Sequence, residues 1–176
     1  MNTERKRAEA ADEGACETEW DRGAAVRNQV LMGAPVLVGS YAIAKQRPAR
    51  LLLFLPAVMV FVTYWRRFIC ARCRYYGREC STMLGVMTAR IMPRDDSRAL
   101  GRNAMIADFA YIGALSLFPL PQVLKSRRLA ALYLLSTAAG ATAILVGACP
   151  KCGNEFCPMK DLSNRIPSRT PGCPPR

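Results

Sequence analysis

The stretch LAALYLLSTAAGATAILVGA, residues 129–148, contains no charged side chain over 20 residues. A helix of this composition has no face that suits water. About 20 apolar residues are what an α-helix needs to cross the ~30 Å hydrocarbon layer of a bilayer. The stretch therefore predicts a transmembrane helix in preference to a buried helix of a soluble bundle.

Three further apolar runs precede this one, at Ala24–Ala44, Leu51–Trp65 and Ala104–Leu124. The run Leu51–Trp65 is short for a span and needs the next four residues, with their two arginines snorkelling toward water. The sequence thus predicts an all-α membrane protein with four transmembrane helices.

The four runs fall into two similar units. Each unit is an apolar run, a short basic link, a second apolar run and a Cys-x2-Cys pair; the links read KQRPAR (45–50) and KSRR (125–128). Two crossings per unit give both units the same orientation, so we predict two parallel helix-hairpin repeats. The chain divides into a polar N-terminal tail (1–23), a first helix hairpin with its Cys cluster (24–80), an amphipathic cytosolic loop (81–103), a second helix hairpin with its Cys cluster (104–157) and a disordered tail (158–176).

The chain is strongly basic, with a net charge of +12 and a pI near 9.8. Such a charge is common in nucleic-acid-binding proteins. Here the bases cluster beside the apolar runs, which is typical of the positive-inside rule. With both termini in the cytosol, nineteen of the 25 Lys and Arg residues face it. We predict a multi-pass protein of the inner or plasma membrane whose partner is the lipid bilayer and not nucleic acid; other membrane subunits are further candidate partners.

The cysteines carry the clearest chemical signal. Six of the eight form two trios, which are Cys70, Cys73 and Cys80 in CARCRYYGREC and Cys149, Cys152 and Cys157 in CPKCGNEFC. Two Cys-x2-Cys turns on the same side of the membrane supply the four thiolates of a tetrahedral zinc site. The chain has no histidine that could complete a smaller site. We predict a cytosol-facing metal site among these six residues.

The simplest ligand set takes both members of each Cys-x2-Cys pair, namely Cys70, Cys73, Cys149 and Cys152. An iron–sulfur cluster uses the same number of thiolates, and CPKCGNEFCP resembles a ferredoxin motif in its first spacing. The predicted cofactor is zinc or an iron–sulfur cluster, serving structure or partner docking.

Other functions for the cysteines remain open. Basic neighbours such as Arg72 and Lys151 favour reactive thiolates, which suits a membrane thiol–disulfide oxidoreductase or an electron-transfer subunit. Four helices with cysteine pairs at the membrane edge resemble, in outline, the quinone-linked membrane oxidoreductases that form disulfides. Soft-metal handling is a third possibility because methionines accompany the thiols: Met83, Met87, Met92 and Met159. Inert buried sulfur is a further alternative, which two trios of matching spacing disfavour.

Two further features bear on function. The absence of histidine excludes Ser/His/Asp and Cys/His hydrolysis. Asp108 lies near the cytosolic start of its apolar run, where Arg102 is within reach, and acids within membrane spans are often functional. Cys16 and Cys173 lie outside the trios and receive no role.

Overall fold

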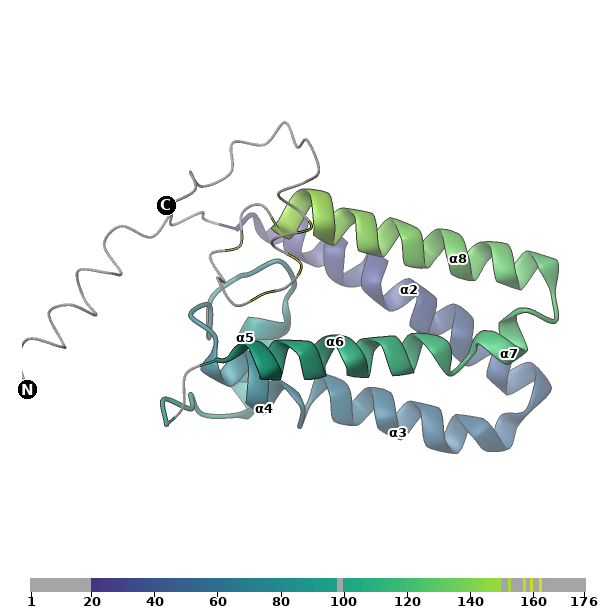
Figure 1. Cartoon of the computed structure of the whole chain (residues 1–176), viewed down its shortest axis with the longest axis horizontal. Coiled ribbons are helices and arrows are strands. Elements are labelled where there is room, and N and C mark those ends of the chain that lie inside the picture. Colours follow the sequence, from purple (N-terminus) through teal and green to yellow (C-terminus); the bar gives the residue numbers. More distant parts are fainter. Residues whose placement is uncertain are drawn as a thin grey trace, which may run out of the picture.

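The computed structural model describes residues 20–97 and 100–149, together with residues 152, 157, 159 and 162. This part of the chain is helical and contains no strand, so the predicted all-α class is confirmed there. Figure 1 shows the long helices lying side by side. They are α2 (Arg22–Gln46), α3 (Leu51–Val62), α6 (Arg102–Leu117) and α8 (Arg127–Thr142).

Short helical segments extend or connect the long ones. The 3-10 turn η1 (Pro48–Arg50) precedes α3, and α4 (Arg66–Ile69) and the 3-10 turn η2 (Cys70–Arg72) follow it. Helix α5 (Leu84–Ile91) lies in the loop that was predicted to be amphipathic. Helix α7 (Leu120–Val123) follows α6 after a turn at Pro119, and the π-helix η3 (Ala143–Ala148) completes α8.

Three segments of the described chain are long and apolar enough to cross a membrane: Pro48–Arg72, Arg102–Val123 and Arg127–Ala148. Helix α2 is long enough to cross a membrane but is not apolar enough, because Arg27, Asn28 and Gln29 interrupt its apolar run. The outer faces of the helices expose large leucines, including Leu52 at 77% and Leu135 at 68%. Exposed apolar surface on this scale indicates a lipid environment, although only three of the four predicted spans are supported.

The break between α3 and α4 has a local cause. The Thr63 hydroxyl donates to the carbonyl of Met59 (2.5 Å), a side-chain bond that competes with the helical pattern. The Arg66 side chain then donates to the carbonyl of Phe61 (3.0 Å), which the turn would otherwise leave without a partner. The arginine therefore stabilises the bend and does not snorkel, and the second span continues through α4.

The long helices associate in two pairs. Helix α2 packs mainly against α8, and α3 packs against α6. The pairs meet at the end that carries α7, where Ala42, Val123 and Tyr133 form a buried core. There the Tyr133 hydroxyl donates to the carbonyl of Ser116 (2.6 Å). A Cβ atom at Gly39 would lie 3.0 Å from the ring of Pro119, so glycine permits this close approach.

A second core lies at the opposite end of the bundle. It contains Ile69, Leu100 and Met105, with Cys70, Cys73 and Cys157 packed against it. The basic links occupy one end of the bundle and the cysteine segments the other (Figure 1). Both the start of α2 and the end of η3 lie at the cysteine end. Most of both predicted tails falls outside the described residues.

Candidate metal centre

Each Cys-x2-Cys pair follows directly on the end of a helix. Cys70 is the C-terminal cap of α4, and Cys149 is that of η3. The backbone N–H of Cys73 donates to the carbonyl of Cys70 at 3.2 Å, and the N–H of Cys152 donates to that of Cys149 at 3.2 Å. The two pairs are 79 residues apart, and in each the second cysteine's N–H donates to the first cysteine's carbonyl.

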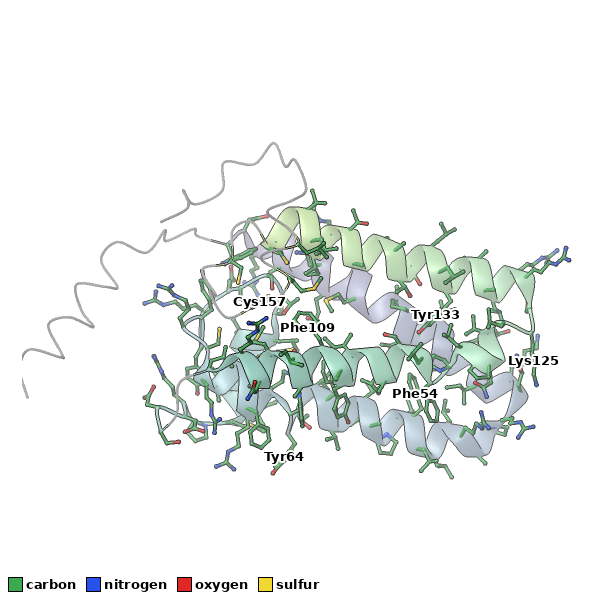
Figure 2. The ribbon with its side chains drawn as sticks, viewed as in Figure 1. Phe54, Tyr64, Phe109, Lys125, Tyr133 and Cys157 are labelled. Atoms are coloured by element: carbon green, nitrogen blue, oxygen red, sulfur yellow. The ribbon has the colours of Figure 1, made fainter. Side chains whose placement is uncertain are left out.

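The fold brings the two clusters to one place. Cys157, from the second cluster, packs in the same apolar core as Cys70 and Cys73 from the first. Cys73 also lies within electrostatic range of Cys152. A common cavity of about 380 Å³ is lined by five of the six thiols: Cys73, Cys80, Cys149, Cys152 and Cys157. Figure 2 shows Cys157 near Phe109 of α6, at the end far from Lys125.

The thiols are near one another without forming a closed site. None of the six described cysteines is in a disulfide. Among the described residues, no three Cys, Asp or Glu side chains lie close enough to hold a metal ion. The first cluster follows α4 and the second follows η3, and cysteines of both clusters line the cavity between the helix pairs. The zinc or iron–sulfur site therefore stays a prediction, and the side-chain arrangement does not itself support it.

The surroundings of the cysteines disfavour free thiolates. Burial raises the pKa of the Cys73 thiol to about 11 and that of the Cys149 thiol to about 12, from an ordinary value of 9.0. Neighbouring cysteines add to both shifts. The helix ends contribute in the same direction, because the last carbonyls of a helix carry partial negative charge. Both thiols are thus protonated near neutral pH unless a cation binds.

The loop that carries Cys80 is closely fixed. Gly77 has a φ of +73°, a left-handed conformation that favours glycine. A Cβ at Gly85 would lie 3.0 Å from the carbonyl oxygens of Tyr75 and Arg78, so the loop wraps directly over this residue. The Cys80 thiol donates to the carbonyl of Thr82 (2.8 Å). Cys80 is therefore oriented by its own loop.

An ion pair anchors the same loop to the end of the second span. Arg72 contacts Asp95 at 2.8 Å, and the Asp95 N–H donates to the carbonyl of Ala71 (3.0 Å). Hydrogen bonds from Ser97 and the nearby Arg72 lower the pKa of Asp95 to about 2. The segment after α5 is thus fastened next to the first Cys-x2-Cys turn.

The sequence analysis missed the partner of Asp108. The carboxylate accepts hydrogen bonds from the Arg66 guanidinium and from the Trp65 indole (3.0 Å), and Arg102 is not its partner. Arg66 is 4% exposed and Asp108 is 7% exposed. The sequence feature that could have indicated this ion pair is the opposite charge of Arg66 and Asp108, which lie at the ends of two apolar runs. The pair joins the two predicted hairpins one helical turn before Cys70.

The remaining candidates are less closely placed. Met159 lines the cavity beside the thiols, whereas Met83 and Met87 belong to the first turns of α5 and its cap. Cys16 and Cys173 lie outside the described residues. No family model, curated protein or solved structure matches the chain. Its function must therefore be argued from its own residues.

Proposed function

We propose that this chain is an integral membrane protein whose two cysteine clusters share one thiolate-bound metal centre at the cytosolic end of the bundle. Zinc is the favoured metal, and an iron–sulfur cluster is the alternative. One observation carries the proposal: two Cys-x2-Cys turns of identical hydrogen bonding, at the ends of two different spans, border one cavity. Cys70, Cys73, Cys149 and Cys152 are the proposed ligands.

The electrostatics of the site favour a bound cation over thiol–disulfide exchange. Reactive cysteines have lowered pKa values and often sit at helix N-termini. Here burial raises the pKa of Cys73 and Cys149, and both turns follow helix C-termini. A metal ion supplies the missing positive charge and displaces the thiol protons.

We infer an internal repeat behind this arrangement. The buried residues of α2 and those of the α6–α7 segment match at a spacing of 80 residues: Ala25 and Met105, Asn28 and Asp108, Gly39 and Pro119, Ala42 and Gln122, Ile43 and Val123. Phe54 and Tyr133 match at 79 residues, the spacing of Cys70 and Cys149. Gly39 also contacts its own counterpart, as residues near an axis between equivalent halves do.

The repeat supports α2 as the fourth span. Its 25 residues extend about 37 Å as an α-helix. It packs alongside α8 and exposes Val30, Leu37 and Tyr41 in the manner of a lipid-facing helix. With four spans, the positive-inside rule assigns the cysteine end and both termini to the cytosol.

A shared metal would act as a clamp. The two helix pairs meet at the α7 end through the contact of Gly39 with Pro119, and at the cysteine end the Asn28 side chain donates to the carbonyl of Ser81 beside the cavity. Four ligands, two from each pair, would join these ends and present a defined surface to a partner. Structural zinc sites contribute directly to folding free energy.

The test is elemental analysis with a visible spectrum of the detergent-purified protein. The proposal predicts about one zinc per chain, or brown colour with absorption near ~400 nm for an iron–sulfur cluster. A Cys80→Ser variant is the matched control and should retain the metal, because serine can keep the bond to Thr82. Metal-free protein with a redox-dependent thiol count would contradict the proposal and favour the oxidoreductase.

A further inference from the structure

The cavity beside the cysteines extends from them into the membrane-spanning part of the bundle. Its volume of about 380 Å³ lies within the range of small-molecule pockets. Its walls come from all sides of the gap between the helix pairs: Met32 and Pro35 of α2, Phe109 and Ile112 of α6, and Thr137 and Ala141 of α8. The lining is overwhelmingly apolar, so the cavity suits a lipophilic guest.

Features of the backbone keep this cavity open. Pro35 removes one hydrogen bond within α2. The six-residue π-helix η3 forms part of the cavity wall near the cysteines. Segments of π-helix are uncommon and are frequent at functional sites. A Cβ at Gly140 would lie 3.1 Å from the carbonyl oxygen of Leu31, so α8 is drawn against α2 and away from α6. These backbone features of α2, α8 and η3 together shape the cavity.

The mouth of the cavity differs from its walls. The Nε1 atom of Trp20 is buried there and has no hydrogen-bond partner among the described residues. The indole ring is held edge-on against Tyr75, with ring centroids 6.5 Å apart. Tryptophan is enriched at the membrane interface, at the depth of the lipid headgroups. A guest in this cavity thus meets the indole N–H of Trp20 at the interface and mainly apolar walls beyond it.

We propose that the cavity binds one acyl chain of a phospholipid, with the ester carbonyl accepting a hydrogen bond from Trp20 Nε1. The chain matches the apolar walls, and the ester carbonyl matches the indole N–H of Trp20, which has no partner among the described residues. Ala141 lines the cavity and is exposed on the outer face of α8, which gives the chain a lateral entry from the bilayer. Cys73, Cys149 and Cys152 also line this cavity, and the acyl chain is proposed to occupy the part of it that lies between α2, α6 and α8.

The probe is phosphatidylcholine with a dibrominated acyl chain, which quenches tryptophan fluorescence on contact. The full-length protein in detergent is titrated with this lipid. A bound chain gives a saturable quenching component at low lipid content, in addition to the linear component from lipid around the bundle. The chain contains two tryptophans, Trp20 and Trp65. In a Trp20→Phe variant only the linear component from Trp65 should remain.

Two variants fill the cavity from opposite walls, Ala141→Phe on α8 and Ile112→Phe on α6. Each should raise the lipid content needed for half-quenching by about tenfold or more. Ala138→Phe is the matched control on α8, since Ala138 is exposed and lies outside the cavity lining. It should behave as the native protein does. Elemental analysis of each variant reports the metal centre separately.

If quenching of the native protein rises only linearly with lipid content, the lipid merely surrounds the bundle and the proposed lipid site is wrong. A saturable component that survives in Trp20→Phe, or in both cavity-filling variants, would overturn it as well. Loss of metal with retained saturable quenching would instead contradict the metal centre alone.

Discussion

Removing the charge of Asp108 should destabilise the bundle strongly, because its partner is buried. The Arg66 guanidinium is held between the Asp108 carboxylate, the carbonyl of Phe61 and the Phe61 ring, whose centroid is 4.1 Å from the guanidinium carbon. Asp108→Asn keeps an oxygen for the Trp65 indole and leaves the arginine buried without its counter-charge.

Breaking one side of a buried ion pair costs about 3–5 kcal/mol. For a chain of 176 residues, each kcal/mol corresponds to roughly 2–4 °C in melting temperature, so we expect a loss of about 6–20 °C. The control is Asp96→Asn. That carboxylate is 74% exposed and pairs with Arg94, so its loss should change stability by less than about 1 kcal/mol.

Thermal unfolding in detergent, followed by circular dichroism, measures both variants. The double variant Arg66→Met with Asp108→Leu removes both charges, and it should recover most of the loss because well-packed apolar side chains can replace a buried pair. If Asp108→Asn has the same melting temperature as Asp96→Asn, the charges of Asp108 and Arg66 are not buried together. The buried ion pair that joins α4 to α6 would then be wrong.

Two further predictions follow from the backbone and the thiols. Gly39→Ala should lower the melting temperature, because the added Cβ would lie 3.0 Å from the ring of Pro119. The control is Gly33→Ala, whose Cβ would have nothing within 4 Å in the described chain and which should be neutral or stabilising by up to about 1 kcal/mol. Equal melting temperatures of the two variants would contradict the close approach of the helix pairs. Metal-free protein should lose stability as the pH rises from about 9 toward 11–12. Burial raises the pKa of Cys73 and Cys149 in the folded protein, so above about pH 9 these thiols ionise first in the unfolded chain, and that ionisation stabilises the unfolded state. The same pH series in Cys73→Ser is the comparison. A melting temperature of the metal-free native protein that is constant from pH 8 to about 11 would show that the thiols are not buried.

The sequence was sufficient for the helical class and for the ends of several elements. Charge-free runs such as 129–148 permit little except an apolar helix, and Pro119 ends α6 where proline disrupts helical bonding. The predicted loop helix appears as α5 and stops before Pro93. These features depend on local chemistry, which a sequence states directly.

The contacts between helices were not predictable in the same way. Apolar runs pack acceptably in many arrangements, so nothing in the sequence fixed the pairing of α2 with α8. The pairing of Asp108 with Arg66 required knowing that α6 lies against α4. The cavity depends on the π-helix at Ala143–Ala148 and on the backbone contact of Gly140, and neither has a clear sequence signature. The sulfur spacing, by contrast, predicted that the six cysteines lie at one end of the bundle, and the structure places them there; their role as metal ligands stays a prediction.

The metal content of three cysteine variants tests the shared metal centre most directly. Cys73→Ser removes a ligand from the first cluster, Cys152→Ser removes one from the second, and the third variant carries both changes. A centre that needs both clusters loses most of its metal in each single variant, and the double variant is barely worse. If each single variant instead retains about half of the metal and the two losses add, each cluster binds alone and the shared centre is wrong.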